Sequence, residues 1–368
     1  MGSKRIEELN KRRTEEYDRV YEEVCRRWDR IAKPLGSLGK FEKMVARIGA
    51  VQESPDVDIS KRAVIIMCAD NGIVAEGVSQ SGQDVTKEVA SWMGLGKSSV
   101  CHFAHAAGAD TFPVDIGINM EGSPEGVLDR KVAKGTKDFL KEPAMSIEEC
   151  MQAIQTGIDI VKELSLKMGY TLIATGEMGI GNTTTSSALA AALLDVDPDE
   201  LTGRGAGLSS EGLSRKKQVI RQGLEMHGAR KDGSSDYALD MLSRLGGLDI
   251  AGLAGVFLGG AACHVPVIID GFISAVAALA AERLSPGTKY CMLASHIGRE
   301  PGMKHVLDEL GLDPVIDGDL ALGEGTGAVM LMPLLDAAVE LYSKAMAFEE
   351  TEVEQYERFD EAEKEAQA

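Results

Sequence analysis

The sequence is poor in aromatic residues and in basic ones. Phe, Trp and Tyr make up 5% of its 368 residues, and 39 Lys and Arg stand against 58 Asp and Glu, so the formal charge is −19. A protein that binds nucleic acid or an anionic membrane needs a basic surface. We therefore expect neither nucleic acid nor a membrane among its partners.

The cysteines show no pairing pattern. The sequence has six, far apart and without a C-x-x-C pair, which is typical of free thiols in a reducing compartment and gives no zinc signature. The first 20 residues are charged throughout and lack the apolar stretch of a secretory signal. We therefore predict a cytoplasmic protein with no metal site. The cysteines are Cys25, Cys68, Cys101, Cys150, Cys263 and Cys291.

No long apolar run is free of helix breakers. The longest uncharged run, residues 251–269, has the length of a membrane span, but four glycines and Pro266 interrupt it. A buried, glycine-rich helix that leads into a parallel strand explains these interruptions better. The apolar content of 44% is enough for a core of normal size. The acidic residues 349–368 are interpreted as a solvated helical tail.

Short apolar runs that end at an acidic residue, a histidine or a glycine recur along the chain. They cover residues 62–70, 111–117, 170–176, 265–270 and 290–296. Helical patterns lie between them, at residues 85–107, 147–168, 183–194, 214–227, 272–283 and 302–310. This alternation predicts an α/β fold with a parallel sheet, in which ligands bind outside the carboxyl ends of the strands. A charged amphipathic helix is predicted at residues 4–31 and a helix with apolar residues at helical spacing at 41–52. The two chain ends, both helical and charged, could pack together as a second, smaller domain.

Several familiar motifs are incomplete. Gly96-Lys97-Ser98 resembles the end of a phosphate-binding P-loop, but Ser91 replaces the first glycine. The loop that starts at Asp195 lacks the glycine and glutamate of a calcium loop. His102 and His105 lie beside Cys101 on an apolar helix, where a packed or capping role is favoured over a metal site.

Two glycine-rich segments carry the stronger signals. In residues 175–187 a strand ends, glycines follow, and three threonines begin an alanine-rich helix, which is an arrangement that binds phosphate or serves as an ordinary helix cap. Residues 203–207 offer a second flexible loop for an anion. In residues 322–328, Glu324 lies between glycines, either as a general base with a raised pKa or as a surface turn.

Together these segments resemble the nicotinate-nucleotide–dimethylbenzimidazole phosphoribosyltransferase family. The resemblance runs in order from about residue 26 to 340. It is carried by Lys33-Pro34-x-Gly36-Ser37-Leu38-Gly39, Ala69-Asp70-x-Gly72-x-x-x-Glu76-Gly77-Val78-Ser79, Val114-Asp115-Ile116-Gly117, Gly176-Glu177-Met178-Gly179-Ile180-Gly181-Asn182-Thr183-Thr184 and Leu322-Gly323-Glu324-Gly325-Thr326-Gly327.

The resemblance implies an enzyme that moves the phosphoribosyl group of nicotinate mononucleotide to 5,6-dimethylbenzimidazole or a related base. The anomeric carbon is inverted, and the products are an α-riboside 5′-phosphate and nicotinate. The family has a large domain with a Rossmann-like parallel sheet, here residues 59–335, and a small helical domain, here residues 1–58 with 336–368. It forms homodimers and needs no cofactor or metal.

The family match also assigns roles to residues. Glu324 is the expected catalytic base, and Glu177 the acid that steadies the cationic centre or orients the ribose. Lys216 is expected on the anion side, with a surface helix lysine as the alternative. The expected phosphate and nucleotide contacts are Gly176, Gly179, Gly181, Asn182, Thr183, Gly203, Gly205, Gly207, Lys216, Asp249, Asp270, Gly323 and Gly325, and the expected base contacts are Ser79, Gln83, Met178 and Leu322.

The chain departs from the family pattern in two places. Asn71 replaces a histidine, and Ser81 and Gly82 replace an aromatic residue and a proline, so a base other than dimethylbenzimidazole, such as adenine or a phenol, is a hypothesis. The family match places residues 295–303 near the phosphate, and there Gly298 and Met303 replace a serine and a histidine, a loss for which Arg299 could compensate. Two alternatives stay open: a catalytically silent partner subunit of a hetero-oligomer, and a nucleotide-dependent oxidoreductase.

Overall fold

Six parallel strands form the main sheet, in the order β3-β2-β1-β4-β5-β6. The computed structural model describes residues 14–358. The strand order reverses between β1 and β4, as it does in doubly wound nucleotide-binding folds, and ligands bind beside such a reversal. The strands are β1 (Arg62–Ala69), β2 (Ala109–Gly117), β3 (Leu128–Asp129), β4 (Leu172–Met178), β5 (Val267–Ile269) and β6 (Met292–Ala294).

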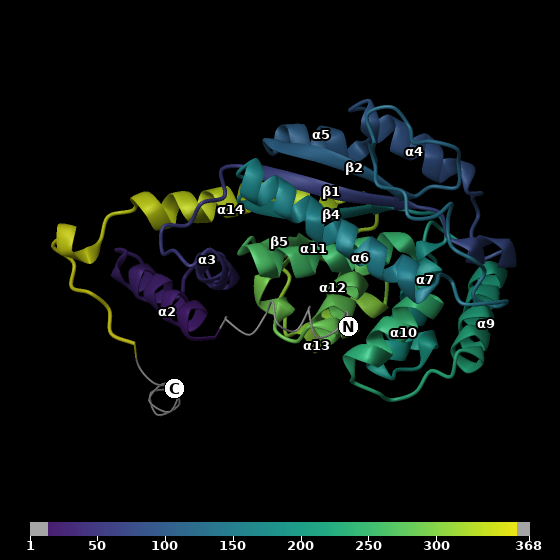
Figure 1. The fold of residues 1–368 in the computed structure, drawn as a ribbon. Helices are drawn as coiled ribbons and strands as arrows, with labels where there is room; N and C mark the ends of the chain where they lie inside the picture. The colour runs from purple at the N-terminus through teal and green to yellow at the C-terminus, as the bar shows by residue number, and fades with distance from the viewer. Residues whose placement is uncertain (1–13, 359–368) are drawn as a thin grey trace. The chain divides into compact units, whose positions relative to one another are not determined.

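Helices cover both faces of this sheet. Figure 1 shows α4 and α5 on one face and α11 and α12 on the other. All residues of β1 after Arg62 are buried, as expected for a strand covered on both faces. The predicted α/β fold with a parallel sheet is therefore confirmed. The helices of this part are α4 (Asp84–Gly94), α5 (Ser99–Ala106), α6 (Ile147–Lys162), α7 (Asn182–Leu194), α8 (Pro198–Leu201), α9 (Ser210–Met226), α10 (Ser235–Leu245), α11 (Leu248–Cys263), α12 (Phe272–Leu284) and α13 (Gly302–Leu310).

The longest uncharged run forms α11 and then β5, as predicted. Its glycines allow close packing, since a Cβ on Gly255 would lie 2.0 Å from the backbone oxygen of Ile154 on α6. This contact explains why a buried helix carries residues that are poor helix formers. Within the described part of the chain, no helix is both long and apolar enough to span a membrane.

Two of the predicted helices differ from the structure. The stretch 85–107 is two helices, because Gly94 packs against the backbone of Glu125 and Gly96 has φ +70°. His102 and His105 are exposed on the second of them, so the packed role predicted for them is wrong. The stretch 147–168 leaves the α-helical pattern after Lys162 and continues as a π-turn, Glu163–Lys167.

The apolar run 290–296 also divides. It contains the end of a 3₁₀ turn, Thr288–Cys291, then β6, and then the start of β7 (His296–Gly298). β7 pairs in parallel with β8 (Ile316–Leu320) in a separate two-stranded sheet. The chain therefore leaves the main sheet after Ala294. His296 lies in the two-stranded sheet and not at the end of a strand of the main sheet.

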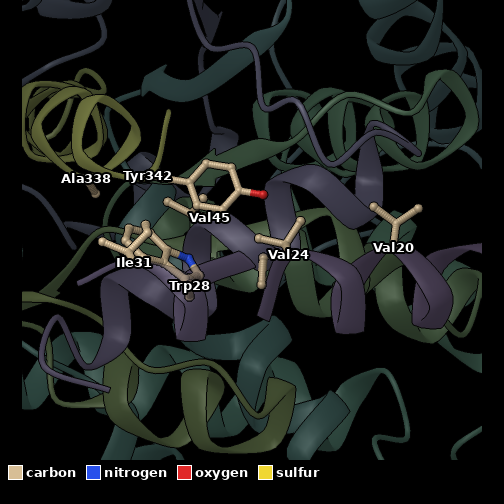
Figure 2. Packing of buried hydrophobic residues seen from close by; sticks show 8 residues of the cluster. Val20, Val24, Trp28, Ile31, Val45, Ala338 and Tyr342 are labelled. Carbon is tan, nitrogen blue, oxygen red and sulfur yellow. The ribbon is translucent and has the colours of Figure 1, made fainter. Parts of the chain in front are cut away.

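Two compact units divide the chain. Residues 59–332 form one, and residues 14–58 with 333–358 form the other. The second contains α2 (Thr14–Arg30), α3 (Lys40–Val51) and the last part of α14 (Thr326–Lys344). Its core packs Trp28 against Tyr342, with ring centroids 5.0 Å apart, as Figure 2 shows. The amino-terminal part of the predicted helix 4–31 lies outside the described residues.

The acidic tail is not helical where it is described. After the 3₁₀ turn Phe348–Glu350, residues 351–358 form neither helix nor strand. Glutamates three and four positions apart repel one another on a helix, and such pairs are frequent here. The prediction of a helical tail is therefore wrong for these residues, and residues 359–368 lie outside the described part.

Candidate functional site

A cavity of about 210 Å³ lies at the carboxyl ends of β4 and β5. Its wall is formed by the loop from β4 to α7, the loop from β5 to α12, β7, and the loop that leads from β8 to α14. The helices α7 and α12 both begin at this wall, and neither has a side-chain cap, because Gly181 and Gly271 precede them. Uncapped helix starts present N–H groups and a partial positive charge, which favour anions.

The side-chain amide of Asn182 links Glu177, at the end of β4, to Asp249 by hydrogen bonds. Asn182 donates one hydrogen bond to Glu177 Oε2 and another, of 3.1 Å, to Asp249 Oδ2. Burial raises the pKa of Glu177 to about 8 and that of Asp249 to about 6. The raised pKa favours the protonated form of Glu177 near neutral pH, and a cation placed beside it would favour its ionisation.

This buried carboxyl predicts a pH-dependent stability. Because the pKa of Glu177 is raised in the folded state, the contribution of this carboxyl to the free energy of unfolding is intact below the ordinary pKa of 4.5. It is lost as the pH rises towards about 8. We expect Glu177→Gln, which cannot ionise, to be about 4 kcal/mol more stable than the wild type at pH 8 and nearly equal at pH 4.5. Urea unfolding at the two pH values measures this difference.

Glu225→Gln is the matched control, because Glu225 is exposed on α9. It should change the free energy of unfolding little at either pH. An equal effect of Glu177→Gln at both pH values would show that the Glu177 carboxyl does not titrate as proposed.

Glu324 stands on a strained loop at the edge of the cavity. Its φ is +62°, between Gly323 at +81° and Gly325 at +99°, and a left-handed conformation is rare for a residue with a Cβ. Its Oε2 accepts a 3.1 Å hydrogen bond from the backbone N–H of Val100, at the start of α5. Burial raises the pKa of Glu324, and this hydrogen bond opposes the shift. The Glu324 carboxylate is thus held in a fixed direction, and its loop is not an ordinary surface turn.

Asp270, after β5, holds this loop in place. Its Oδ2 accepts from the N–H of Gly325 at 3.1 Å and its Oδ1 from the N–H of Ala328 at 3.0 Å. Both oxygens are therefore used to fix the Glu324 loop and the first turn of α14. Asp270 also lines the cavity, so it combines a positioning role with a place at the site.

Lys216 is completely buried behind the cavity wall. Its Nζ donates to Thr183 Oγ1 at 2.9 Å and to the carbonyl oxygen of Gly203 at 3.2 Å. Burial lowers its pKa to about 8. Glu300 holds the same loop from the other side, since its Oε1 accepts from the N–H of Gly205 at 2.9 Å. The alternative of an exposed helix lysine is therefore wrong.

The structure separates the predicted site residues into three groups. Ten line the cavity: Glu177, Met178, Gly179, Asn182, Thr183, Gly205, Asp270, Leu322, Gly323 and Glu324. Another group is not in the lining: Gly176, Gly181, Gly203, Gly207, Lys216, Asp249 and Gly325. Ser79 and Gln83 are also outside the lining; Gln83 Nε2 donates to the carbonyl oxygen of Asn71 at 3.2 Å, and Ser79 Oγ accepts from the N–H of Ser81 at 3.2 Å.

Other lining residues were not among the predicted contacts. His296 and Glu300 come from the segment 295–303, whose departures from the family pattern were the available signal, and Arg299, which was expected to compensate for those departures, lines the cavity as well. The contact of Val100 with Glu324 joins residues 224 positions apart, and nothing in the local sequence indicates it. Among residues 14–358, no group of three His, Cys, Asp or Glu side chains is arranged to hold a metal ion.

Comparisons with known proteins agree with one another. A family model described as "Phosphoribosyltransferase" matches residues 15–353. A nicotinate-nucleotide–dimethylbenzimidazole phosphoribosyltransferase of Acetivibrio thermocellus is 44% identical over 92% of this chain and 95% of its own. The corresponding protein of Clostridium acetobutylicum is 41% identical over the same shares. A crystal structure of CobT from Thermus thermophilus superposes with a TM-score of 0.86 at 37% identity, covering 92% of this chain and all of that one.

Proposed function

The chain belongs to the nicotinate-nucleotide–dimethylbenzimidazole phosphoribosyltransferase family, and we propose that the cavity at the ends of β4 and β5 is where its reaction takes place. The enzyme moves the phosphoribosyl group of nicotinate mononucleotide to dimethylbenzimidazole in the assembly of the cobalamin lower ligand. The observation that carries the assignment of the site is the convergence of Glu177, Asp270 and Glu324 on one cavity with two uncapped helix starts.

This arrangement matches the charges of the donor. Nicotinate mononucleotide has a cationic pyridinium ring and two anionic groups, a phosphate and a carboxylate. The carboxylates suit the cationic ring and the positive charge that develops at the anomeric carbon, and the helix starts suit the anions. Because the ring nitrogen is already cationic, nicotinate leaves with the electron pair of the glycosidic bond and needs no proton.

The phosphate is proposed to bind at the start of α7. Asn182 and Thr183 begin this helix and line the cavity, and Gly205 lines it beside Thr183, since a Cβ on Gly205 would lie 2.9 Å from Thr183 Oγ1. Lys216 reaches the same place from behind, through Thr183 Oγ1. The N–H groups of a helix start bind phosphate well, and a buried ammonium group adds charge that solvent does not screen.

Glu324 is proposed as the catalytic base. A nitrogen of the azole attacks the anomeric carbon, and the other ring nitrogen then loses its proton, which a carboxylate with a raised pKa can accept. Glu177, which ionises as the cationic ring approaches, is proposed to steady the anomeric centre. Met178 and Leu322 form an apolar wall for the base. Ser79 and Gln83 contribute to base binding only if their loop approaches the cavity.

The experiment that tests the function is a product assay without added metal. Purified protein is incubated with nicotinate mononucleotide and, in separate reactions, dimethylbenzimidazole, adenine or a phenol, and riboside phosphate is measured by chromatography. We expect product with dimethylbenzimidazole. Product with adenine or phenol as well would support a broadened base pocket, whereas exclusive use of dimethylbenzimidazole would contradict it. No product with any base would favour the silent partner subunit.

The assembly and location are part of the same proposal. We propose that residues 59–332 carry catalysis, that the chain forms a homodimer, and that it works in the cytoplasm without a cofactor. The six cysteines, all free thiols, support a reducing compartment.

A further inference from the structure

The segment Gly96-Lys97-Ser98, which resembles the end of a P-loop, precedes α5 and has no role in the mechanism above. In a P-loop, such a segment opens a helix whose first N–H groups bind phosphate. Here the helix begins at Ser99, and the N–H of Val100 in its first turn donates to Glu324 Oε2 at 3.1 Å. The start of α5 therefore binds an anion, and this anion is a carboxylate of the protein itself.

Ser98 occupies the N-cap position of α5 but does not cap the helix. A serine at this position usually accepts a hydrogen bond from the N–H of the second or third helical residue. Within residues 14–358, the structure gives the Ser98 side chain no such bond. Val100 is the second residue of the helix, and its N–H is held by Glu324, 224 positions away in the sequence. The Ser98 hydroxyl is thus left for a different partner.

The surroundings of Ser98 direct its hydroxyl proton to Glu324. Ser98 is 3% exposed, so solvent competes little for this proton. Its Oγ lies 3.2 Å from Cys101 Sγ, and this thiol donates its single proton to the carbonyl oxygen of Met93 at 3.6 Å. The sulfur is then only a weak acceptor, whereas a carboxylate is a strong one. The hydrogen bond of the Ser98 side chain to Glu324 lowers the pKa of that carboxyl.

Glu324 is held at both of its ends. Asp270 fixes the backbone of the loop through the N–H groups of Gly325 and Ala328, and the start of α5 holds the carboxylate. Glu324 lines the cavity, but Ser98 and Val100 do not. The donors at the start of α5 therefore act on the reaction only through Glu324.

We propose that the start of α5 is the anion site of the catalytic base, and that Ser98 is a positioning residue that orients the Glu324 carboxylate and keeps it ionised until the azole arrives. The inference rests on the proposed function, because it needs Glu324 to accept the azole proton. A hydroxyl donor and a helix start both favour the anionic form of a carboxyl group. As the proton passes to Glu324, the electron pair of the N–H bond stays on the azole ring.

The charges around Glu324 show why these donors are needed. Asp270, after β5, raises the pKa of Glu324, and Glu177, at the end of β4, is close to the same loop, since a Cβ on Gly323 would lie 2.8 Å from its Oε1. Both carboxyl groups disfavour a further negative charge beside them. The other charged or titratable side chains of the cavity and of the α5 segment are His296, Arg299, Glu300, Lys97, His102 and His105, of which the last three are exposed.

Ser98→Ala removes the hydroxyl and should make Glu324 harder to ionise. We expect the acidic limb of the kcat profile with dimethylbenzimidazole to move to higher pH by about one pH unit, with a loss of about tenfold at its acidic end. The base form is then lost at a higher pH than in the wild type. Ser99→Ala, at the next position of the same helix, is the control and should keep the wild-type profile. An unchanged limb in Ser98→Ala would overturn the proposal.

Two further measurements separate positioning from a merely structural role. 1-Methylbenzimidazole has no ring proton to lose, so Ser98→Ala should use it at a rate close to that of the wild type. In the Glu324→Gln background, Ser98→Ala should cause no further loss of kcat with dimethylbenzimidazole, because no base is left to position. An equal loss with both bases, or an additive loss in the double variant, would overturn the role of Ser98. Absence of product from the wild type with any base would instead overturn the proposed function.

Discussion

Glu324→Gln is expected to lower kcat with dimethylbenzimidazole by about a hundredfold or more and to change KM for nicotinate mononucleotide only a few-fold. General base catalysis contributes about 10²–10⁴ to a rate, and glutamine cannot accept the azole proton. The amide keeps an oxygen that can accept from the N–H of Val100, so the loop and its contact with α5 are preserved. Steady-state kinetics with both substrates varied measures the effect.

A methylated base separates proton transfer from positioning. 1-Methylbenzimidazole can attack the anomeric carbon but has no ring proton to lose, so its reaction needs no base. We expect wild type and Glu324→Gln to use it at similar rates. If the variant were as impaired with the methylated base as with dimethylbenzimidazole, Glu324 would be a positioning residue and the assignment of the base would be wrong.

The pH profile gives a second readout of the same group. Because burial raises the pKa of Glu324, the carboxylate needed as a base is present above that pKa and is lost as the pH falls. The wild type should therefore lose kcat on the acidic side, and Glu324→Gln should not show this limb. Glu225→Gln, with its exposed carboxyl, should retain the wild-type profile.

The sheet could be predicted from the sequence because its strands are buried on both faces. When turn residues flank a continuous apolar run such as residues 62–69, a strand that is buried on both faces is the simplest explanation. The residues at the carboxyl ends of these runs mark the side of the sheet where ligands bind. Glu177, Asp270 and Glu324 were all found in this way or through the family pattern. The fold and the main acidic residues were therefore accessible without coordinates.

The errors arose where contacts distant in sequence decide the local structure. The predicted helix 85–107 breaks because Gly94 meets the backbone near Glu125, and no pattern within the helix shows this. For Lys216 the sequence left an anion-side contact and a surface helix lysine open, and the structure excludes the second, because the helix α9 turns the side chain into the protein beneath Thr183. His296 is not among the predicted contacts, because only the folded structure shows that it lines the cavity.

The predicted role of Gly176 changes most between sequence and structure. It was expected to contact the nucleotide, but it lies outside the lining of the cavity and beneath the Glu324 loop. A Cβ added to it would lie 2.3 Å from the backbone oxygen of Glu324 and 2.8 Å from its carbonyl carbon. Both atoms belong to the backbone, so the loop itself must move to accept a methyl group.

Gly176→Ala is therefore expected to lower kcat by about a hundredfold, because a displacement of about 1 Å at a catalytic group has effects of this size. Overpacking should also reduce the free energy of unfolding by about 1–3 kcal/mol. Unlike Glu324→Gln, this variant should be impaired with dimethylbenzimidazole and 1-methylbenzimidazole alike, since the whole loop moves and not only the proton acceptor. Gly233→Ala, where a Cβ meets nothing within 4 Å, is the control and should retain activity. Wild-type kinetics in Gly176→Ala would mean that the contact between β4 and the Glu324 loop does not position the base.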